Sequence, residues 1–265
     1  MLKTRLLTAL VAIPLLWLIV RYLPMGLFTG FICAVAAVAL FEYFEMALPD
    51  HPAERGLGVG GGILVAAAVV SGQPQVLGAG LALAVILGLI LPLVRTTDPL
   101  GATQRLGLSL LGVLYFGFLT AHIVLLRAGF DGWRWVLFTV FTAMGSDSGG
   151  YFAGRAFGRH RLAPTVSPSK TVEGGLGAIA GAVLIAVLAK LFILPMLGLR
   201  EAMALGAVVS VLAQLGDLCE SALKRAFGAK DSGWIIPGHG GILDRLDSLL
   251  FPIVFAYYYA ALPRF

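Results

Sequence analysis

The sequence predicts an all-α, polytopic integral membrane protein with about nine transmembrane helices. Three properties of the 265-residue chain lead to this prediction: 59% of its residues are apolar, only 12% are charged, and the mean hydropathy is +0.93. Soluble domains carry about 25% charged residues, so a soluble chain of this composition would leave much apolar surface in water. These properties exclude an ordinary soluble enzyme and an intrinsically disordered chain.

Apolar runs of roughly 16 to 24 residues predict the helices in chain order. They lie near residues 6–23, 25–47, 57–72, 75–94, 106–126, 134–153, 174–197, 201–223 and 248–262. The third run is short and rich in glycine, and the last is also short. We divide the chain into N-terminal transmembrane helices (1–130) and a C-terminal catalytic region (131–265).

The first run has the charge pattern of a signal peptide, because Lys3 and Arg5 precede it. However, it reaches Leu23, the second run follows at once, and no small-residue cleavage site is evident. We therefore expect the first run to be a membrane span.

Glycines within the runs predict close helix packing. Gly56, Gly58 and Gly61 formally match the dinucleotide-binding pattern G-x-G-x-x-G, but they open an apolar run and follow no strand. Gly177 and Gly181 form a G-x-x-x-G pair. Such spans are also compatible with a helix-packed homodimer.

The distribution of basic residues predicts a cytoplasmic N-terminus. In that orientation the inner segments carry 13 of the 19 Lys and Arg residues. The two most polar connections, 154–173 and 224–247, then lie on the same cytoplasmic face. The net charge of +5 is too small and too scattered for a nucleic-acid partner, but it suits basic loops that face an anionic leaflet.

The inner end of the eighth run carries acidic residues. Placing a carboxylate inside a membrane costs free energy, so such residues usually have a functional or structural role. Asp217, Glu220, Ser221 and Lys224 are spaced i, i+3, i+4 and i+7, which places them on one face of a helix.

A second acidic pair, Asp244 and Asp247, stands where the ninth run begins, with Arg245 between them. These could be interfacial carboxylates paired with Lys224, Arg225 and Arg245. Two such pairs on either side of one glycine-rich turn favour a metal site over interfacial ion pairs. Carboxylate oxygens are hard ligands, which favour Mg²⁺. The pattern does not decide whether a second metal ion binds.

The 224–247 connection has the composition of a phosphate site. Gly240 and Gly241 would let a phosphate approach backbone N–H groups, and His239 could donate to it or move a proton. Positive charge comes from Lys224, Arg225, Lys230 and Arg245.

The 154–173 connection also contains residues suited to binding a phosphate. Asp147 ends the sixth run, and Tyr151 follows at helical spacing. Ser167 and Lys170 precede a helix start, where N–H groups and the dipole favour anions. An ordinary positive-inside loop explains this segment equally well, and Lys170-Thr171 lacks the preceding glycine of a P-loop.

Two acidic residues in the second run have no assigned role. Glu42 and Glu45 could line a cavity or pair with Arg55 or Arg95.

Residues 221–247 resemble the signature of the phosphatidate cytidylyltransferases. The matching segments are Ser221 to Arg225, Lys230-Asp231-Ser-Gly233, and Ile236-Pro-Gly-His-Gly-Gly-Ile-Leu-Asp-Arg-Leu-Asp247. Gly216-Asp217, the run at 167–174, and Asp147 with Tyr151 are also similar to that family. The first 140 residues agree with it only as hydrophobic helices.

The resemblance implies the reaction CTP + phosphatidate → CDP-diacylglycerol + pyrophosphate at the cytoplasmic face of the inner membrane. It implies Mg²⁺ bound by Asp217, Asp244 and Asp247, to which the helical spacing adds Glu220. CTP would enter from the cytoplasm and phosphatidate from the inner leaflet. We expect phosphate alignment from Lys170, Lys224, Arg225, Lys230 and Arg245, pyrophosphate release aided by His239, and further substrate contacts from Asp147, Tyr151, Ser167, Ser221, Gly240 and Gly241.

Two other functions stay open. A CTP-dependent lipid kinase of the dolichol-kinase type would transfer the γ-phosphoryl group and release CDP. A cation-coupled transporter would place polar residues near mid-span and relate its halves by a repeat, whereas here the charges gather at one face. A CDP-alcohol phosphotransferase is disfavoured, because the one Asp-Gly pair, Asp131-Gly132, continues with Trp-Arg.

Overall fold

The computed structural model describes residues 13–95, 98–233 and 241–262, and within them the backbone alone at 91–95. A helix at Ile13–Tyr22 is followed by α2 (Met25–Ala47), α3 (Pro52–Val70), α4 (Pro74–Arg95) and α5 (Pro99–Gly112). The π-helix η1 (Val113–Phe118) joins α5 to α6 (Leu119–Ala128). The second half contains α7 (Gly132–Phe157), β1 (Arg161–Ala163), β2 (Ser167–Thr171), α8 (Val172–Phe192), α9 (Leu199–Ala226), α10 (Leu243–Leu246) and α11 (Leu250–Ala261).

Local chemistry explains several helix starts. Proline stands at the first helical turn of α3 and α5, where its missing N–H costs nothing. Thr171 caps α8, because its hydroxyl accepts a hydrogen bond from the Gly174 N–H at 3.1 Å. The Glu201 carboxylate accepts the Gly198 N–H and so holds the start of α9.

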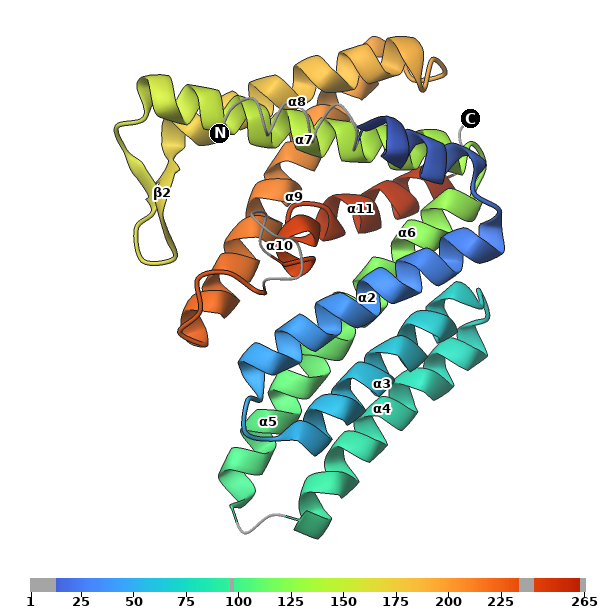
Figure 1. Cartoon of the computed structure of the whole chain (residues 1–265). Helices are drawn as coiled ribbons and strands as arrows, with labels where there is room; N and C mark the ends of the chain where they lie inside the picture. The colour runs from blue at the N-terminus through green and yellow to red at the C-terminus, as the bar shows by residue number, and fades with distance from the viewer. Residues whose placement is uncertain (1–12, 96–97, 234–240, 263–265) are drawn as a thin grey trace.

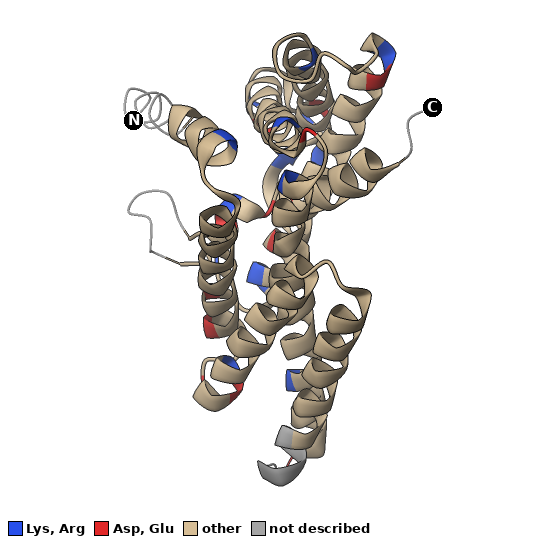
Figure 2. Cartoon of the chain, turned by 90° about the vertical axis from the view of Figure 1, so that its right-hand side faces the viewer, with Lys and Arg blue, Asp and Glu red and all other residues tan. Residues whose placement is uncertain are grey.

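Five helical segments in the described part of the chain are long and apolar enough to cross a membrane. They are Met25–Ala47, Pro52–Val70, Pro99–Ala128, Val172–Phe192 and Leu199–Ala226. Charged residues are sparse along the helices (Figure 2). The helical membrane class is thus supported, while the count of nine spans stays a prediction.

The elements form two groups that meet at α6, α9 and α11 (Figure 1). In one, α3 packs against α2 and α4. In the other, α7 and α8 pack along each other and α9 crosses them. Two of the apolar cores combine residues from both halves of the chain: one includes Phe28 and Trp135, and the other includes Leu40 and Leu250. This packing brings the C-terminal end of α2 close to α10.

Glycines set how closely the helices approach. A Cβ on Gly117 in η1 would lie 2.5 Å from the Gly62 carbonyl oxygen on α3. A Cβ on Gly58 would overlap the ring of Phe44. The expectation that glycines serve helix packing is confirmed at Gly58, and also at Gly181 on α8, which faces the backbone of α7. It is wrong at Gly56, where an added Cβ would meet no atom within 4 Å.

Two local features differ from the sequence prediction. The 154–173 connection was expected to be a loop without strands, but β1 and β2 form an antiparallel pair. The two prolines and the polar residues of this connection do not show the apolar alternation by which a strand is recognised in a sequence. The expected continuous helix at 106–126 contains the π-helix η1, and hydropathy cannot register such a bulge.

We expect Gly181→Ala to destabilise the protein by about 1–3 kcal/mol, because its methyl group would meet backbone atoms that cannot move aside. Those atoms are the Gly145 oxygen at 2.5 Å and the Gly149 Cα at 3.0 Å. Thermal unfolding in detergent would measure the loss. The control is Gly30→Ala on α2, where the added Cβ meets no atom within 4 Å. Equal melting temperatures for the two variants would contradict this account of α7–α8 packing.

Candidate active site

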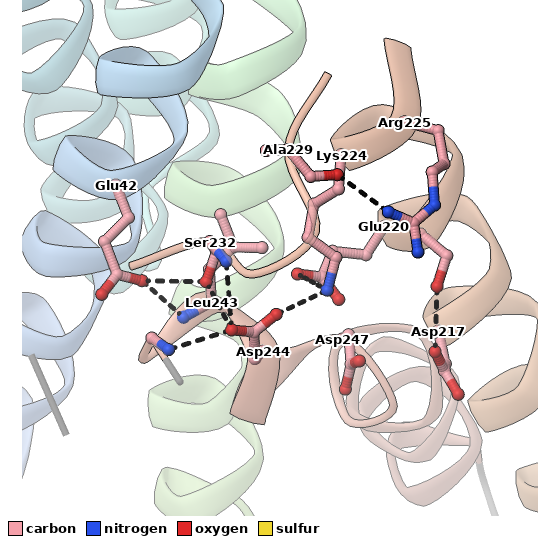
Figure 3. A network of polar contacts seen from close by, with 12 residues as sticks. Glu42, Asp217, Glu220, Lys224, Arg225, Ala229, Ser232, Leu243, Asp244 and Asp247 are labelled. Carbon is pink, nitrogen blue, oxygen red and sulfur yellow. Dashed lines mark hydrogen bonds and ion pairs between the residues drawn. The ribbon is translucent and has the colours of Figure 1, made fainter. Parts of the chain in front are cut away.

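Asp244 on α10 is the centre of a polar network between the end of α9 and the 224–247 connection (Figure 3). Its Oδ1 atom accepts a hydrogen bond from Lys224 Nζ at 2.5 Å. Its Oδ2 atom accepts from the Ser232 N–H at 3.2 Å, from Ser232 Oγ at 2.9 Å and from the Gly241 N–H at 2.9 Å. One carboxylate therefore joins α9, the connection and α10.

These donors decide the charge of Asp244. Burial opposes its ionisation, but the Lys224 ammonium and the donors from Gly241 and Ser232 outweigh burial and lower the pKa of Asp244 to about 2. Asp244 is therefore an anion at any physiological pH.

Lys224 also contacts Glu220, one helical turn earlier on α9, with 3.2 Å between Nζ and Oε1. The lysine side chain is only 12% exposed and that of Glu220 only 1%. Among the described residues, neither carboxylate oxygen of Glu220 has a hydrogen-bond donor in proper geometry. The Lys224 ammonium is the cation that compensates this buried side chain.

The two polar connections of the sequence meet at α9. Lys170, from β2, lies 2.5 Å from Asp217 Oδ2, and Ser221 Oγ donates to the same carboxylate at 3.4 Å. Lys170 and Lys224 therefore contact carboxylates on one face of α9, as the i, i+3, i+7 spacing predicts.

Asp147 and Asp247 extend this acidic group. Ser248 Oγ donates to Asp147 at 3.4 Å, which links α7 to the start of α11. Asp147 lies near enough to Asp217 and Asp247 for their charges to repel it. Burial, with the charge of Asp217, raises the pKa of Asp247. More carboxyl groups than lysines therefore lie in this group, and burial and mutual repulsion oppose the ionisation of all of them at once.

Several predicted site residues contact their own chain or lie at its surface. Tyr151, exposed on α7, accepts a hydrogen bond from Arg155 Nη1 at 3.0 Å. Arg225 donates to the Ala229 carbonyl. The Gly241 N–H, expected to face a phosphate, instead donates to Asp244. Lys230 and Arg245 are exposed, and Ser167 is half-buried on β2.

The predicted roles of these residues are not tested by their positions. His239 and Gly240 lie outside the described residues.

The sequence analysis left Glu42 unassigned and did not select Ser232. Glu42 is 1% exposed and accepts hydrogen bonds from the Ile242 and Leu243 N–H groups at 3.1 and 2.9 Å. Ser232 Oγ lies 3.4 Å from Glu42 Oε2 as well as near Asp244. An acidic residue near the end of an apolar run was the only signal for Glu42, and Glu45, three residues later, is exposed.

The sequence profile of the cytidylyltransferase family matches residues 3–262, nearly the whole chain. The chain belongs to the cytidylyltransferase family. It is 44% identical over 121 residues to a phosphatidate cytidylyltransferase of Staphylococcus epidermidis, covering 46% of each chain. It is 39% identical over 161 residues to that of Bacillus subtilis, covering 60% of each. These alignments span about half the length of the curated relatives.

The donor set of this cytidylyltransferase-family site suits a hard divalent cation, because it consists of carboxylate oxygens. Among the described residues, the two buried oxygens of Glu220 have the Lys224 ion pair but no hydrogen bond in proper geometry. Within residues 13–90, 98–233 and 241–262, however, no three acidic, histidine or cysteine side chains are arranged to hold one ion. Lys170 and Lys224 instead neutralise Asp217 and Asp244.

We expect Asp244 to make the protein sensitive to acid. Because its folded pKa of about 2 lies below the ordinary 3.8, the stability it contributes is complete above about pH 4 and is lost as the pH falls towards 2. The free energy of unfolding in detergent, measured between pH 6 and pH 2, should therefore fall less steeply in Asp244→Asn. Asp50→Asn, at an exposed position, should retain the wild-type slope. If Asp244→Asn also retains that slope, the carboxylate is not held as an anion.

Proposed function

We propose that the chain transfers a cytidylyl group from CTP to phosphatidate, giving CDP-diacylglycerol and pyrophosphate. The observation that best supports this is the meeting of two lysine–carboxylate pairs, Lys170–Asp217 and Lys224–Asp244, on α9. Such a site offers cations for a polyphosphate and carboxylates for a metal ion. The curated relatives carry the name phosphatidate cytidylyltransferase.

In the proposed reaction, a phosphate oxygen of phosphatidate attacks the α-phosphorus of CTP. The new P–O bond forms as the bond from the α-phosphorus to the bridging oxygen breaks, and pyrophosphate leaves with that oxygen. The attacking monoester is already ionised at neutral pH, so no strong general base is required. Catalysis then depends on alignment and charge neutralisation.

The basic side chains would supply that alignment. Lys170 and Lys224 lie at the acidic face, and both would attract the triphosphate and the phosphatidate headgroup. Arg225, Lys230 and Arg245, from the same connection, would contribute longer-range attraction, because they are exposed. The proposal assigns the leaving pyrophosphate to His239 and further substrate contacts to Asp147, Tyr151, Ser167, Ser221, Gly240 and Gly241.

Mg²⁺ is part of the proposal, with a second metal ion left open. Asp217, Glu220, Asp244 and Asp247 would hold it, and when bound it would screen the negative charge of the CTP phosphates. The carboxylates alone would repel CTP, so the proposal requires a cation for nucleotide binding.

The proposed topology has nine spans with the N-terminus in the cytoplasm, and the active site at the cytoplasmic face of the inner membrane. Residues 131–265 form the catalytic region in this proposal, and the two substrates reach it from different sides. CTP arrives from the cytoplasm, while phosphatidate enters from the inner leaflet with its acyl chains still in lipid. A homodimer would bury part of the glycine-rich helix surface.

The reaction is tested with detergent-purified protein, phosphatidate micelles and CTP labelled on its α-phosphate, with and without Mg²⁺. We expect the label to move into the chloroform phase with release of one pyrophosphate per transfer. Removal of Mg²⁺ with EDTA should reduce turnover at least 100-fold, on the order of a lost electrostatic catalyst. ATP in place of CTP serves as the matched control.

The products separate this proposal from its alternatives. A lipid kinase would leave no label in the lipid and would release CDP when supplied with a polyprenol. Absence of both products from folded protein would contradict the transferase and favour a cation-coupled transporter.

A further inference from the structure

Glu42 is a buried carboxylate outside the residues assigned to the reaction. It lies near the end of α2, far from the catalytic region in sequence, and is 1% exposed. A carboxylate in an apolar helix is costly unless donors satisfy it. Here the donors are the Ile242 and Leu243 N–H groups at the start of α10. The Ser232 hydroxyl, whose single proton is donated to Asp244 at 2.9 Å, lies 3.4 Å from Glu42 Oε2.

Two glycines of the connection pack directly on this carboxylate. A Cβ on Gly233 would lie 2.6 Å from Glu42 Oε1 and 2.9 Å from its Cδ. A Cβ on Gly241 would overlap Glu42 Oε2 and the Ser232 hydroxyl. Neither glycine has a positive φ, so their small size, and not their backbone freedom, is what this arrangement requires.

The same contacts reach Asp244. Ser232 Oγ bridges Glu42 and Asp244, with distances of 3.4 and 2.9 Å to their carboxylates. Glu42 also accepts the N–H of Leu243, the residue immediately before Asp244 (Figure 3). The orientation of Asp244 towards Lys224 therefore depends on where Glu42 holds the start of α10.

We propose that Glu42 is a positioning residue for cytidylyl transfer: its carboxylate anchors the start of α10 so that Asp244 meets Lys224. Only the effect on kcat rests on the proposed function, whereas the anchoring by Glu42 does not. A carboxylate is required, because both oxygens of Glu42 face donors and a glutamine amide would place its own N–H₂ against one of them.

The test compares Glu42→Gln with Glu45→Gln, a control on the same helix whose side chain is exposed. Amide hydrogen exchange in detergent would follow residues 241–246, and steady-state kinetics would separate kcat from KM for CTP. We expect Glu42→Gln to speed exchange at Ile242 and Leu243 and to lower kcat about 10- to 100-fold, as misplacement of a catalytic group does. KM should change less than about threefold, and Glu45→Gln should match wild type.

Two further variants keep the test decisive. Glu42→Asp retains the charge and should recover part of the lost kcat. Gly233→Ala, which presses a methyl group on the carboxylate, should reproduce the exchange effect even if Glu42→Gln fails to fold.

Wild-type exchange and kcat in Glu42→Gln would overturn the proposal, as would a lower melting temperature with unchanged kcat for the folded fraction. If wild-type protein makes no CDP-diacylglycerol, the proposed function fails, while the exchange data still decide whether Glu42 holds the start of α10.

Discussion

The hydrogen-bonded ion pair between Lys224 and Asp244 is the contact on which the rest of the site depends. Lys224 belongs to α9, whereas Asp244 belongs to α10, and the segment between them has little regular structure where it is described. The pair closes this segment, and Ser232 and Gly241 donate to the same carboxylate. Charge-assisted hydrogen bonds of this kind are stronger than neutral ones, and their partial burial limits screening by solvent.

Helix packing supplies the frame in which this pair can form. Glycines let α7 and α8 approach at backbone distance, and α9 packs against both. That arrangement carries Lys170, at the end of the β1–β2 hairpin, to Asp217 on α9. Opposing charges are thus placed by a helix and a strand, which hold a site more precisely than loops alone.

The apolar runs of the sequence predicted the helical class. The energetic cost of a carboxylate inside a membrane singled out the acidic residues, and their i, i+3 and i+4 spacing, which is a local property of a helix, predicted the acidic face of α9. The sequence analysis predicted that the two polar connections share one face of the membrane, but it did not predict that Lys170 contacts Asp217. The β1–β2 hairpin, the π-helix and the partners of Glu42 could not be predicted in this way. The partners of Glu42 depend on contacts between residues distant in sequence, such as Glu42 with Leu243, and a single sequence without aligned relatives carries no signal for them. The hairpin and the π-helix are local, but the hairpin is polar and contains two prolines, and hydropathy does not register a π-helix.

The most direct test of the central claim is a double-mutant cycle on Lys224→Met and Asp244→Asn, read in both the free energy of unfolding and kcat. If the pair organises the site, each single change leaves a partly buried charge without its partner. The double variant should then be no less stable than the worse single variant, with a coupling of about 1–3 kcal/mol. Effects that add within about 0.5 kcal/mol would mean that the two side chains act independently, and would contradict this account.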